Sequence, residues 1–416
     1  MRKMRDSGIE WVGAIPQDWQ LSKIGSLYTQ RNEKVSDKDY QPLSVTMQGI
    51  LPQLATAAKT DDGDNRKLVR VGDFAINSRS DRRGSCGISP LDGSVSLINI
   101  ILTPRTAMHP GYYNWLFHTT LFADEFYKWG HGIVADLWTT RWQEMKSITV
   151  PVPEYAEQER IAAFLDAECA EIDTVLEKTR ASIEEYKKLK QAIITQAVTK
   201  GIRGDRPMKD SGIEWIGDIP AEWSVVPFSK FARVSANLVN PSDYQDYLQV
   251  SPENIEKDSG KLLSCKTVSE VGVESWNHFF HKGQILYSKI RPKLNKVCIA
   301  PFDGLCSADM YPIDTDNISK FVVYTILSND FNQQVAMITE NRVKMPKINQ
   351  KELSKIIVVL PADRMEQQEI VDYLDGECGK IDALIAKKQQ YLTEIENYKK
   401  SLIYEYVTGK KEVHPL

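Results

Sequence analysis

Two short basic clusters are the residues of this sequence whose types best suit a binding chemistry. The first, "NSRSDRRGS" (77–85), contains Ser78, Arg79, Arg82 and Arg83. The second, "YSKIRPKLNK" (287–296), contains Ser288, Lys289, Arg291, Lys293, Asn295 and Lys296. Arginine and asparagine can hydrogen-bond base edges bidentately, whereas lysine, serine and backbone amides hold phosphates. Each cluster follows a strand-like run, so we expect both on loops that suit nucleic-acid contacts, although a single cluster of this kind is more often solvated surface.

A second basic and aromatic group follows each cluster later in the chain. "DLWTTRW" (136–142) surrounds Arg141, and "ENRVKMPKINQ" (340–350) carries Arg342, Lys344 and Lys347. These groups are weaker candidates for nucleic-acid contacts, because Trp138 and Trp142 are equally suited to a hydrophobic core.

The sequence contains no recognisable catalytic motif. It has no glycine-rich loop ending in Gly-Lys-Ser/Thr, no GxSxG turn and no HExxH helix. "NPSDY" (240–244) lacks the second proline of the Asn-Pro-Pro-Tyr signature of amino-methyltransferases, so we interpret it as a turn. "HFFH" (278–281) has no further ligand at metal-binding spacing. We therefore predict no catalytic residue and no metal site.

Length and composition indicate a folded protein of two or three domains. The chain has 416 residues, of which 42% are hydrophobic and 26% charged, and no apolar run is long enough to span a membrane. The six cysteines form no CxxC pair and no secretory signal opens the chain, so we expect reduced thiols in the cytoplasm. The net charge of −4 arises mainly in two acidic stretches, 154–200 and 363–411, which leaves room for local basic clusters elsewhere.

The chain is an internal duplication. Eleven of the sixteen residues from Met4 to Trp19 are identical in Met208 to Trp223. "EQERIAAFLDAECAEIDTVL" from Glu157 matches "EQQEIVDYLDGECGKIDALI" from Glu366 at an offset of 209. Between these segments, 71–93 aligns with 282–304 without gaps at an offset of 211, but most of the aligned residues differ. Each half therefore consists of a constant lead segment with two tryptophans, a divergent globular part and a constant final part. We interpret the lead segment as a structural anchor to the helix ends.

The final parts are predicted to be long helices. Apolar residues recur at alternating spacings of four and three, which is the pattern of a coiled-coil seam, and the same register appears in both halves. Lys190 and Lys399 occupy equivalent seam positions, and Gly201 and Gly409 follow as expected caps. The alternative is that each helix packs only on its own globular part. The predicted seam consists of Leu165, Ile172, Leu176, Ile183, Ile193, Leu374, Ile381, Ile385, Leu392 and Leu402.

The predicted fold is α/β (α+β). "SLINIILTP" and "SKIIVVLP" indicate strands, and "NWLFHTTLFADEFYKW" and "FVVYTILSNDFNQQVAMI" each indicate an amphipathic helix. If the long helices pair antiparallel, two copies of one unit are related by a pseudo-two-fold axis. We predict globular domains at 1–153 and 204–361, a long helix at 154–203, and a second long helix with a C-terminal tail at 362–416.

The duplicated "DSGIEWIGDIP" segment, "SKIRPKLNK" and the paired "EQ…I…LD…ID" helices resemble the specificity subunits of type I restriction-modification enzymes over essentially the whole chain. The resemblance implies two target recognition domains, each binding one half of a bipartite double-stranded DNA site, with helices that set the spacing and dock modification subunits, of which we expect two. "NSRSDRRGS" departs from the "YSKIRPKLNK" form, which leaves the DNA contacts of the first half less defined.

The same resemblance implies that catalysis and cofactors lie in partner chains. A modification subunit would use S-adenosylmethionine to methylate adenine, and a restriction subunit would use ATP and magnesium to cleave DNA. Two other functions remain open at this point: a methyltransferase with a built-in recognition domain, and a coiled-coil scaffold without DNA readout.

Overall fold

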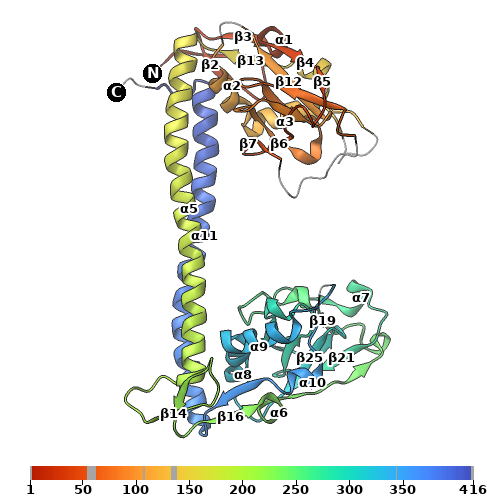
Figure 1. Cartoon of the computed structure of the whole chain (residues 1–416), viewed down its shortest axis with the longest axis vertical. Helices are drawn as coiled ribbons and strands as arrows, with labels where there is room; N and C mark the ends of the chain where they lie inside the picture. Colours follow the sequence, from red (N-terminus) through yellow and green to blue (C-terminus); the bar gives the residue numbers. More distant parts are fainter. Residues whose placement is uncertain (1, 54–61, 106–107, 133–137, 343, 414–416) are drawn as a thin grey trace. The chain divides into compact units, whose positions relative to one another are not determined.

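The computed structural model describes residues 2–53, 62–105, 108–132, 138–342 and 344–413 (Figure 1). The chain divides into two compact units, Met1–Thr179 with Gln390–Leu416, and Arg180–Gln389. Both divisions fall within the two long helices, α5 (Tyr155–Lys200) and α11 (Arg364–Val407), so each unit contains part of both helices. The prediction of long helices at these places is confirmed, whereas the four-part domain division stays a prediction.

The globular part of the first unit contains short strands and short helices. Its two largest sheets have the strand orders β10-β9-β12-β4 and β11-β8-β5. The strands are β1 (Met4–Asp6), β2 (Ala14–Pro16), β3 (Gln20–Lys23), β4 (Tyr28–Arg31), β5 (Lys34–Val35), β6 (Leu43–Thr46), β7 (Gly49–Pro52), β8 (Arg66–Val69), β9 (Phe74–Asn77), β10 (Cys86–Ile88), β11 (Gly93–Val95), β12 (Asn99–Pro104) and β13 (Thr149–Val152). The helices are α1 (Ile24–Leu27), α2 (Pro110–Phe117), α3 (Thr120–Lys128) and α4 (Trp142–Met145).

The second unit repeats the same framework with a different second sheet. Its sheets have the orders β17-β25-β22-β23 and β18-β21-β24-β19-β20. The strands are β14 (Met208–Asp210), β15 (Asp218–Pro220), β16 (Ser224–Pro227), β17 (Arg233–Val234), β18 (Leu238–Val239), β19 (Leu248–Val250), β20 (Lys266–Thr267), β21 (Asn277–Phe280), β22 (Ile285–Ser288), β23 (Val297–Ile299), β24 (Gly304–Cys306), β25 (Met310–Asp314) and β26 (Ile357–Leu360). The helices are α6 (Phe228–Phe231), α7 (Val268–Val271), α8 (Ser319–Leu327), α9 (Asn329–Thr339) and α10 (Gln350–Leu353).

The strands pair almost entirely antiparallel, as an α+β fold requires. Among the named strands of the described residues, only β19 and β24 pair parallel. In each unit the strand after the lead segment pairs with the strand before a long helix, β3 with β13 and β16 with β26. These pairs close each globular part onto the start of its helix. The "NPSDY" turn is a 3-10 turn, Pro241–Tyr244, capped by the Asn240 side chain.

The prediction of one amphipathic helix late in each globular part was wrong in one respect. The first predicted helix is two helices, α2 and α3, and the second is α8 and α9. The hydroxyls of Thr119 and Ser328 accept hydrogen bonds from the backbone N–H of Phe122 and Phe331, so each begins a new helix. Threonine and serine favour such caps, and the break lets both helices bury an apolar face.

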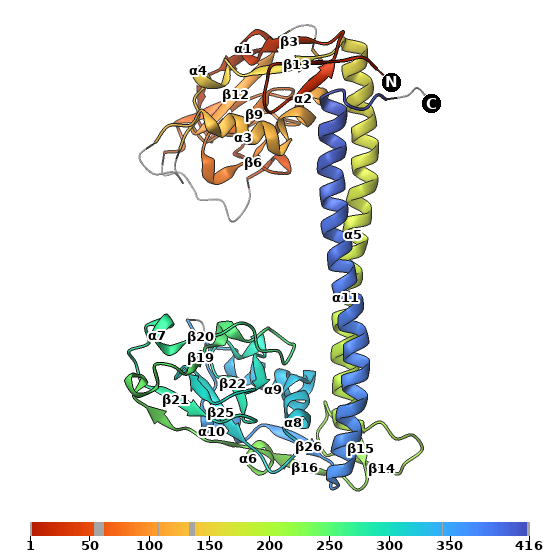
Figure 2. The ribbon, with the colours of Figure 1, turned by 180° about the vertical axis from the view of Figure 1, so that it is seen from behind.

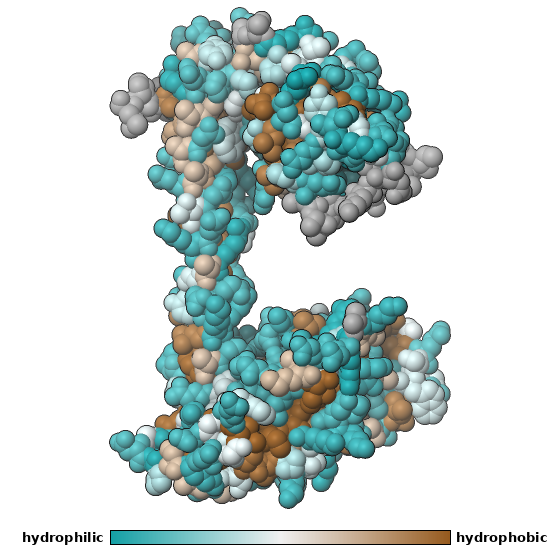
Figure 3. Space-filling view, in the orientation of Figure 1, coloured by the Kyte–Doolittle hydropathy of each residue, from teal (hydrophilic) through white to brown (hydrophobic). Residues whose placement is uncertain are grey.

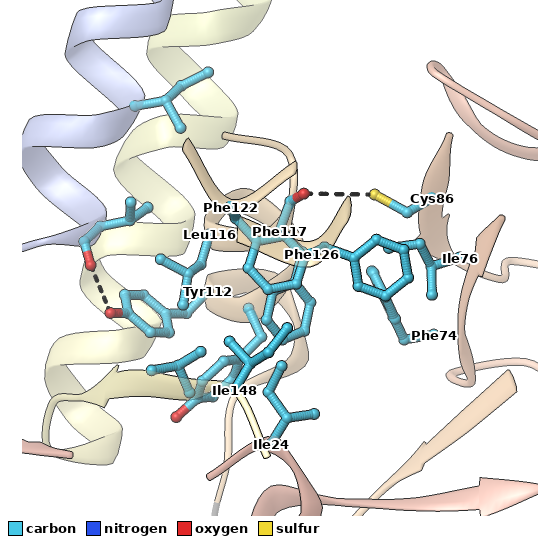
Figure 4. Close-up of a cluster of buried hydrophobic side chains, with 14 of the residues drawn as sticks. Ile24, Phe74, Ile76, Cys86, Tyr112, Leu116, Phe117, Phe122, Phe126 and Ile148 are labelled. Carbon is cyan, nitrogen blue, oxygen red and sulfur yellow. Dashed lines mark hydrogen bonds between the residues drawn. The ribbon is translucent and has the colours of Figure 1, made fainter. Parts of the chain in front are cut away.

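The core of the first unit joins the helices to the sheet. Figure 4 shows aromatic side chains of α2 and α3, including Phe117 and Phe122, beside Phe74 and Ile76 of β9. The Tyr112 hydroxyl donates to the carbonyl of Val407, at 2.7 Å, which ties this core to the end of α11. Leu165 and Leu402 from the two long helices belong to the same cluster.

The lead segments anchor each globular part to the helix ends, as predicted. Trp19 is buried and its indole N–H donates to Glu157 of α5, at 2.9 Å. Trp223 is fully buried and donates in the same way to Glu366 of α11, at 3.0 Å. Arg2 and Arg206 also bind these two carboxylates. A buried indole with a satisfied N–H fixes both the position and the rotation of the segment.

Left-handed glycines end both long helices beside these anchors. Gly201 has φ +75° and Gly409 has φ +69°, conformations that suit glycine at a helix C-terminus. A Cβ added at Gly409 would lie 2.5 Å from Pro16, and one at Gly201 would lie 3.2 Å from the Trp223 ring. Each lead segment therefore contacts the end of one long helix and the start of the other.

The two long helices pack side by side in each unit (Figures 1 and 2). In the first unit Phe164 stacks near Tyr406, with ring centroids 4.4 Å apart, so an early residue of α5 meets a late residue of α11 and the helices run antiparallel. None of the predicted seam residues is exposed, and Figure 3 shows a mainly hydrophilic helix surface. The buried seam residues are Leu165, Ile172, Leu176, Ile183, Leu374, Ile381 and Leu402, and the half-buried ones are Ile193, Ile385 and Leu392.

The two seam lysines form equivalent ion pairs between the helices. Lys399 binds Asp173 at 2.6 Å in the first unit, and Lys190 binds Asp382 at 2.8 Å in the second. Asp382 also forms an ion pair with Lys261 of the second globular part, at 3.2 Å. A polar seam residue with one specific partner fixes the helix register.

We expect Asp382→Asn to lower the free energy of unfolding of the second unit by about 1–3 kcal/mol at pH 7, between the effects of exposed and buried pairs. Burial acts to raise the pKa of Asp382, but hydrogen bonds from Lys190 and Lys261 bring it below its ordinary value. The carboxylate therefore stabilises the fold above its unfolded-state pKa and loses this effect as the pH falls through the lowered folded pKa. Urea denaturation at several pH values should show the difference narrowing below about pH 4.

Asp173→Asn is the matched control in the first unit. The Asp173 side chain is 55% exposed and binds a single lysine, so its replacement should have a smaller effect. Equal losses for both variants would contradict the assigned role of Lys261.

Candidate nucleic-acid interface

Each predicted basic cluster lies on the loop between two equivalent strands of the four-stranded sheet of its unit. The first cluster connects β9 to β10, and the second connects β22 to β23. The two loops occupy equivalent positions in the repeat, so the structure confirms that they are loops and that they match.

The structure joins the two basic groups of each half into one surface. In the first unit Arg79 pairs with Thr139 in an antiparallel bridge, and the N–H of Ser80 donates to the carbonyl of Trp138 at 2.9 Å. We call residues 78–85 with 138–141 the first basic surface. Leu137, which precedes this segment, lies outside the described residues.

The second unit has the same arrangement. Ile290 pairs with Lys347, the N–H of Arg291 donates to the carbonyl of Pro346 at 2.7 Å, and Ile348 donates to Lys289 at 2.9 Å. We call residues 288–296 with Arg342 and 344–348 the second basic surface. Sequence reasoning treated the groups as separate because about fifty residues lie between them.

Three of the predicted contact residues are buried inside these loops. The Ser78 hydroxyl donates to the carbonyl of Ile98, and the Ser288 hydroxyl donates to Ile290 at 3.0 Å. Asn295 is 2% exposed and adopts φ +45°, a left-handed conformation that asparagine tolerates. The two serine hydroxyls support their loops, and Asn295 is buried in a left-handed conformation, so we revise the predicted role of these three residues from direct DNA contact to shaping the surface.

Several of the predicted cations are engaged within the protein. Lys289 lies 5.4 Å from the centre of the Tyr311 ring, and the Lys296 ammonium donates to the carbonyl of Pro252 at 2.6 Å. Arg342 binds Glu352 through both terminal nitrogens, and this carboxylate raises the pKa of Arg342. In the first unit Arg83 pairs with Asp124 and lies over the Tyr127 ring.

Other predicted cations project from the two surfaces. Arg79, Arg291, Lys293, Lys344 and Lys347 are exposed, and none of them forms an ion pair with another described residue. Arg82 and Arg141 are exposed as well, with Arg82 3.8 Å from Asp81. Exposed cations of this kind can meet phosphates or base edges, although Arg82 would first have to leave Asp81.

One aromatic and one imidazole side chain near the two surfaces differ in exposure and charge. Trp138, which the sequence could not separate from a core residue, is 39% exposed beside Arg141. Burial and the nearby Lys289 charge lower the pKa of His278, so its imidazole is neutral at pH 7 and adds no charge to the second surface. The structure thus makes Trp138 an exposed member of the first basic surface and not a core residue, a choice that sequence reasoning left open.

A large groove in the second unit is distinct from the basic surface. It has a volume of about 1230 Å³ and is lined by α5, α11 and the loop 256–261. Its lysines are mostly balanced, since Lys187 pairs with Glu184, and Lys190 and Lys261 share Asp382. We therefore do not place a nucleic acid in this groove.

Comparisons with known proteins point to one family. A family model for the type I restriction modification DNA specificity domain matches residues 230–397. The chain is 34% identical over 286 residues to the specificity subunit of the Escherichia coli type I restriction enzyme EcoDI, covering 64% of this chain. It is 26% identical over 283 residues, 65% of this chain, to a Methanocaldococcus jannaschii protein that carries the name of a type I specificity subunit, MjaX. The matches span 63% and 61% of the lengths of these two relatives.

A solved structure has the same fold over nearly the whole chain. It is a chain from work on the complex assembly and conformational transition of a type I R-M system, with a TM-score of 0.71 and 13% sequence identity. The match covers 95% of this chain and 99% of that one. Among the described residues, no helix combines the length and the apolarity of a membrane span.

Proposed function

Because a family model for the type I specificity domain matches this chain and a type I specificity subunit is 34% identical to it over 286 residues, we propose that it is the DNA-recognition subunit of a type I restriction-modification complex. Each globular part reads one half of a bipartite, asymmetric site in double-stranded DNA. The observation that carries this proposal is the matched pair of basic surfaces, built on the same loop of the same sheet in both units. Their side chains differ, so the two half-sites should differ in sequence.

The proposal assigns all covalent chemistry to partner chains. Modification subunits would bind S-adenosylmethionine and methylate adenine, and restriction subunits would bind ATP and magnesium and cleave DNA. The sequence supports this division, because it carries neither the glycine-rich loop nor the Asn-Pro-Pro-Tyr signature that a methyltransferase needs. We expect the complex to act in the cytoplasm, where its DNA substrate lies.

The long helices would form an antiparallel coiled coil that sets the DNA spacing and docks two modification subunits about a pseudo-two-fold axis. The equivalent pairs Lys399–Asp173 and Lys190–Asp382 support a fixed register. The burial of the predicted seam residues supports pairing of the two helices within each unit. A rigid spacer of this kind would hold the two reading surfaces at one separation.

Shortening both helices tests the spacer. Removing one heptad from each helix at equivalent positions, 178–184 and 387–393, shortens the pair by about 10 Å, because a helix rises about 1.5 Å per residue. We expect the non-specific spacer of the methylated site to shorten by about three base pairs at about 3.4 Å each. Both half-sites should keep their sequences. A change in either half-site would show that the helices also shape the reading surfaces.

Mapping adenine methylation tests the function itself. The full chain is expressed with its modification subunit in a bacterial host that lacks other adenine methylation, and the host genome is sequenced for modified bases. We expect one bipartite motif with a fixed spacer. Methylation without a defined motif would favour a scaffold, and methylation by this chain alone would favour a methyltransferase.

A further inference from the structure

Arg291 stands out for its backbone conformation. Its φ of +45° and ψ of +51° are left-handed, a region that side chains with a Cβ rarely adopt. The other non-glycine residues with positive φ in the described part of the chain are Asp205, Asp258 and Asn295. Aspartate and asparagine tolerate this region because their short side chains bond the local backbone, whereas arginine gains no such compensation.

The surrounding structure holds Arg291 in this conformation. Its N–H donates to Pro346 at 2.7 Å, and its carbonyl accepts from Leu294 at 2.8 Å. The next residue, Pro292, is buried. Strain that persists under such constraints is common where a side chain must point in one direction for binding. The Arg291 side chain itself is exposed.

The guanidinium of Arg291 differs from the other cations of the second basic surface. Arg342 already uses both terminal nitrogens on Glu352. The remaining cations are lysines, whose single ammonium cannot form the two parallel bonds of a guanidinium fork. Among the described residues of this surface, Arg291 is therefore the arginine whose fork is available.

Comparing equivalent positions in the two basic loops shows which features are shared and which differ. At an offset of 211, Gly84 and Asn295 both have positive φ, and Arg82 and Lys293 are both exposed cations. At the same offset Arg291 corresponds to Ser80. Features that both loops share suit phosphate contacts, which any sequence offers, and a position that differs suits base selection.

We propose that Arg291 reads a guanine in the half-site of the second unit, with its two N–H groups donating to guanine O6 and N7 in the major groove. This proposal rests on the DNA-recognition function proposed above. An arginine fork discriminates guanine because no other base presents two acceptors in this pattern. Lys293, in contrast, holds a phosphate and adds affinity without selecting a base.

The test compares Arg291→Lys and Arg291→Gly with Lys293→Ala, each in the full chain with its modification subunit in the methylation-mapping host. Arg291→Lys keeps the positive charge but removes the two parallel N–H donors of the guanidinium. Arg291→Gly suits the left-handed backbone, so its effect does not depend on a misfolded loop. We expect both Arg291 variants to lower the preference for one G·C pair by about tenfold to a hundredfold. Lys293→Ala should lower methylation of all sites and keep the motif.

The outcomes separate this inference from the function on which it rests. An Arg291→Gly motif identical to the wild-type motif would overturn the inference, as would relaxation at an A·T pair. A wild-type complex without any bipartite motif would instead overturn the proposed function. The half-site of the first unit serves as the internal control for folding, because it should stay unchanged in every Arg291 variant.

Discussion

Replacing Glu366 with alanine is expected to lower the free energy of unfolding of the second unit by about 3–5 kcal/mol, the typical cost of removing one partner of a buried ion pair. The Glu366 side chain is 3% exposed and binds Arg206, whose side chain is 9% exposed. It also accepts the indole N–H of fully buried Trp223. Its loss would leave the indole donor of Trp223 unpaired and would leave Arg206 with only the exposed Glu222 as its partner. Urea denaturation followed by tryptophan fluorescence measures the change.

Glu369→Ala is the matched control for this prediction. Glu369 lies one turn further along α11 and pairs with Arg203, but both side chains are nearly half exposed. We expect its replacement to change the unfolding free energy by less than about 1 kcal/mol. If the two glutamate variants unfold alike, the lead segment is not the anchor of the second unit.

Removing four exposed cations from the second basic surface should have the largest effect on DNA binding. The variant replaces Arg291, Lys293, Lys344 and Lys347 with alanine. Each phosphate contact contributes about 0.9 to the slope of log affinity against log salt concentration, so we expect the slope to fall by about 3–4 units if all four meet phosphates. A fall nearer 3 units fits the base-reading role of Arg291. Fluorescence anisotropy of a labelled duplex with the complex, over a salt series, measures it.

The engaged cations provide the control for the salt series. Lys289 lies over Tyr311 and Lys296 donates to Pro252, so replacing these two should change the salt slope little. A slope that falls equally in both variants would mean that charge anywhere on this unit attracts DNA. In that case the projecting side chains would not define the interface.

The local elements of the fold followed from the sequence. The period of the seam residues predicts both long helices, because apolar residues at alternating spacings of four and three lie on one helix face. Gly201 and Gly409 mark the helix ends, since glycine accepts the left-handed cap. The predicted single helix late in each half was wrong, because the caps Thr119 and Ser328 interrupt a continuous apolar pattern. Periodicity alone does not reveal a cap within an amphipathic run.

The contacts of the "EQ" pair at the start of each long helix are visible only in the structure. Sequence reasoning treated it as a helix start, whereas Glu157 and Glu366 receive the tryptophans of the lead segments. The adjacent Gln158 and Gln367 accept from the backbone N–H of His109 and Ile318, at the starts of α2 and α8. These partners lie between about fifty and 140 residues away along the chain, and residue spacing carries no information on contacts of that range.

The sequence by itself determined the repeat, the helix periodicity and the position of the basic clusters, because these depend on residue types and short spacings. Only the tertiary structure decided which cations remain available for DNA. Ser78, Ser288 and Asn295 are buried, and acids or carbonyls between ten and about forty-five residues away engage Arg83, Arg342 and Lys296. The physical reason is that a charge is neutralised by whatever the fold brings within a few ångströms, and that neighbour is set by packing of the whole unit.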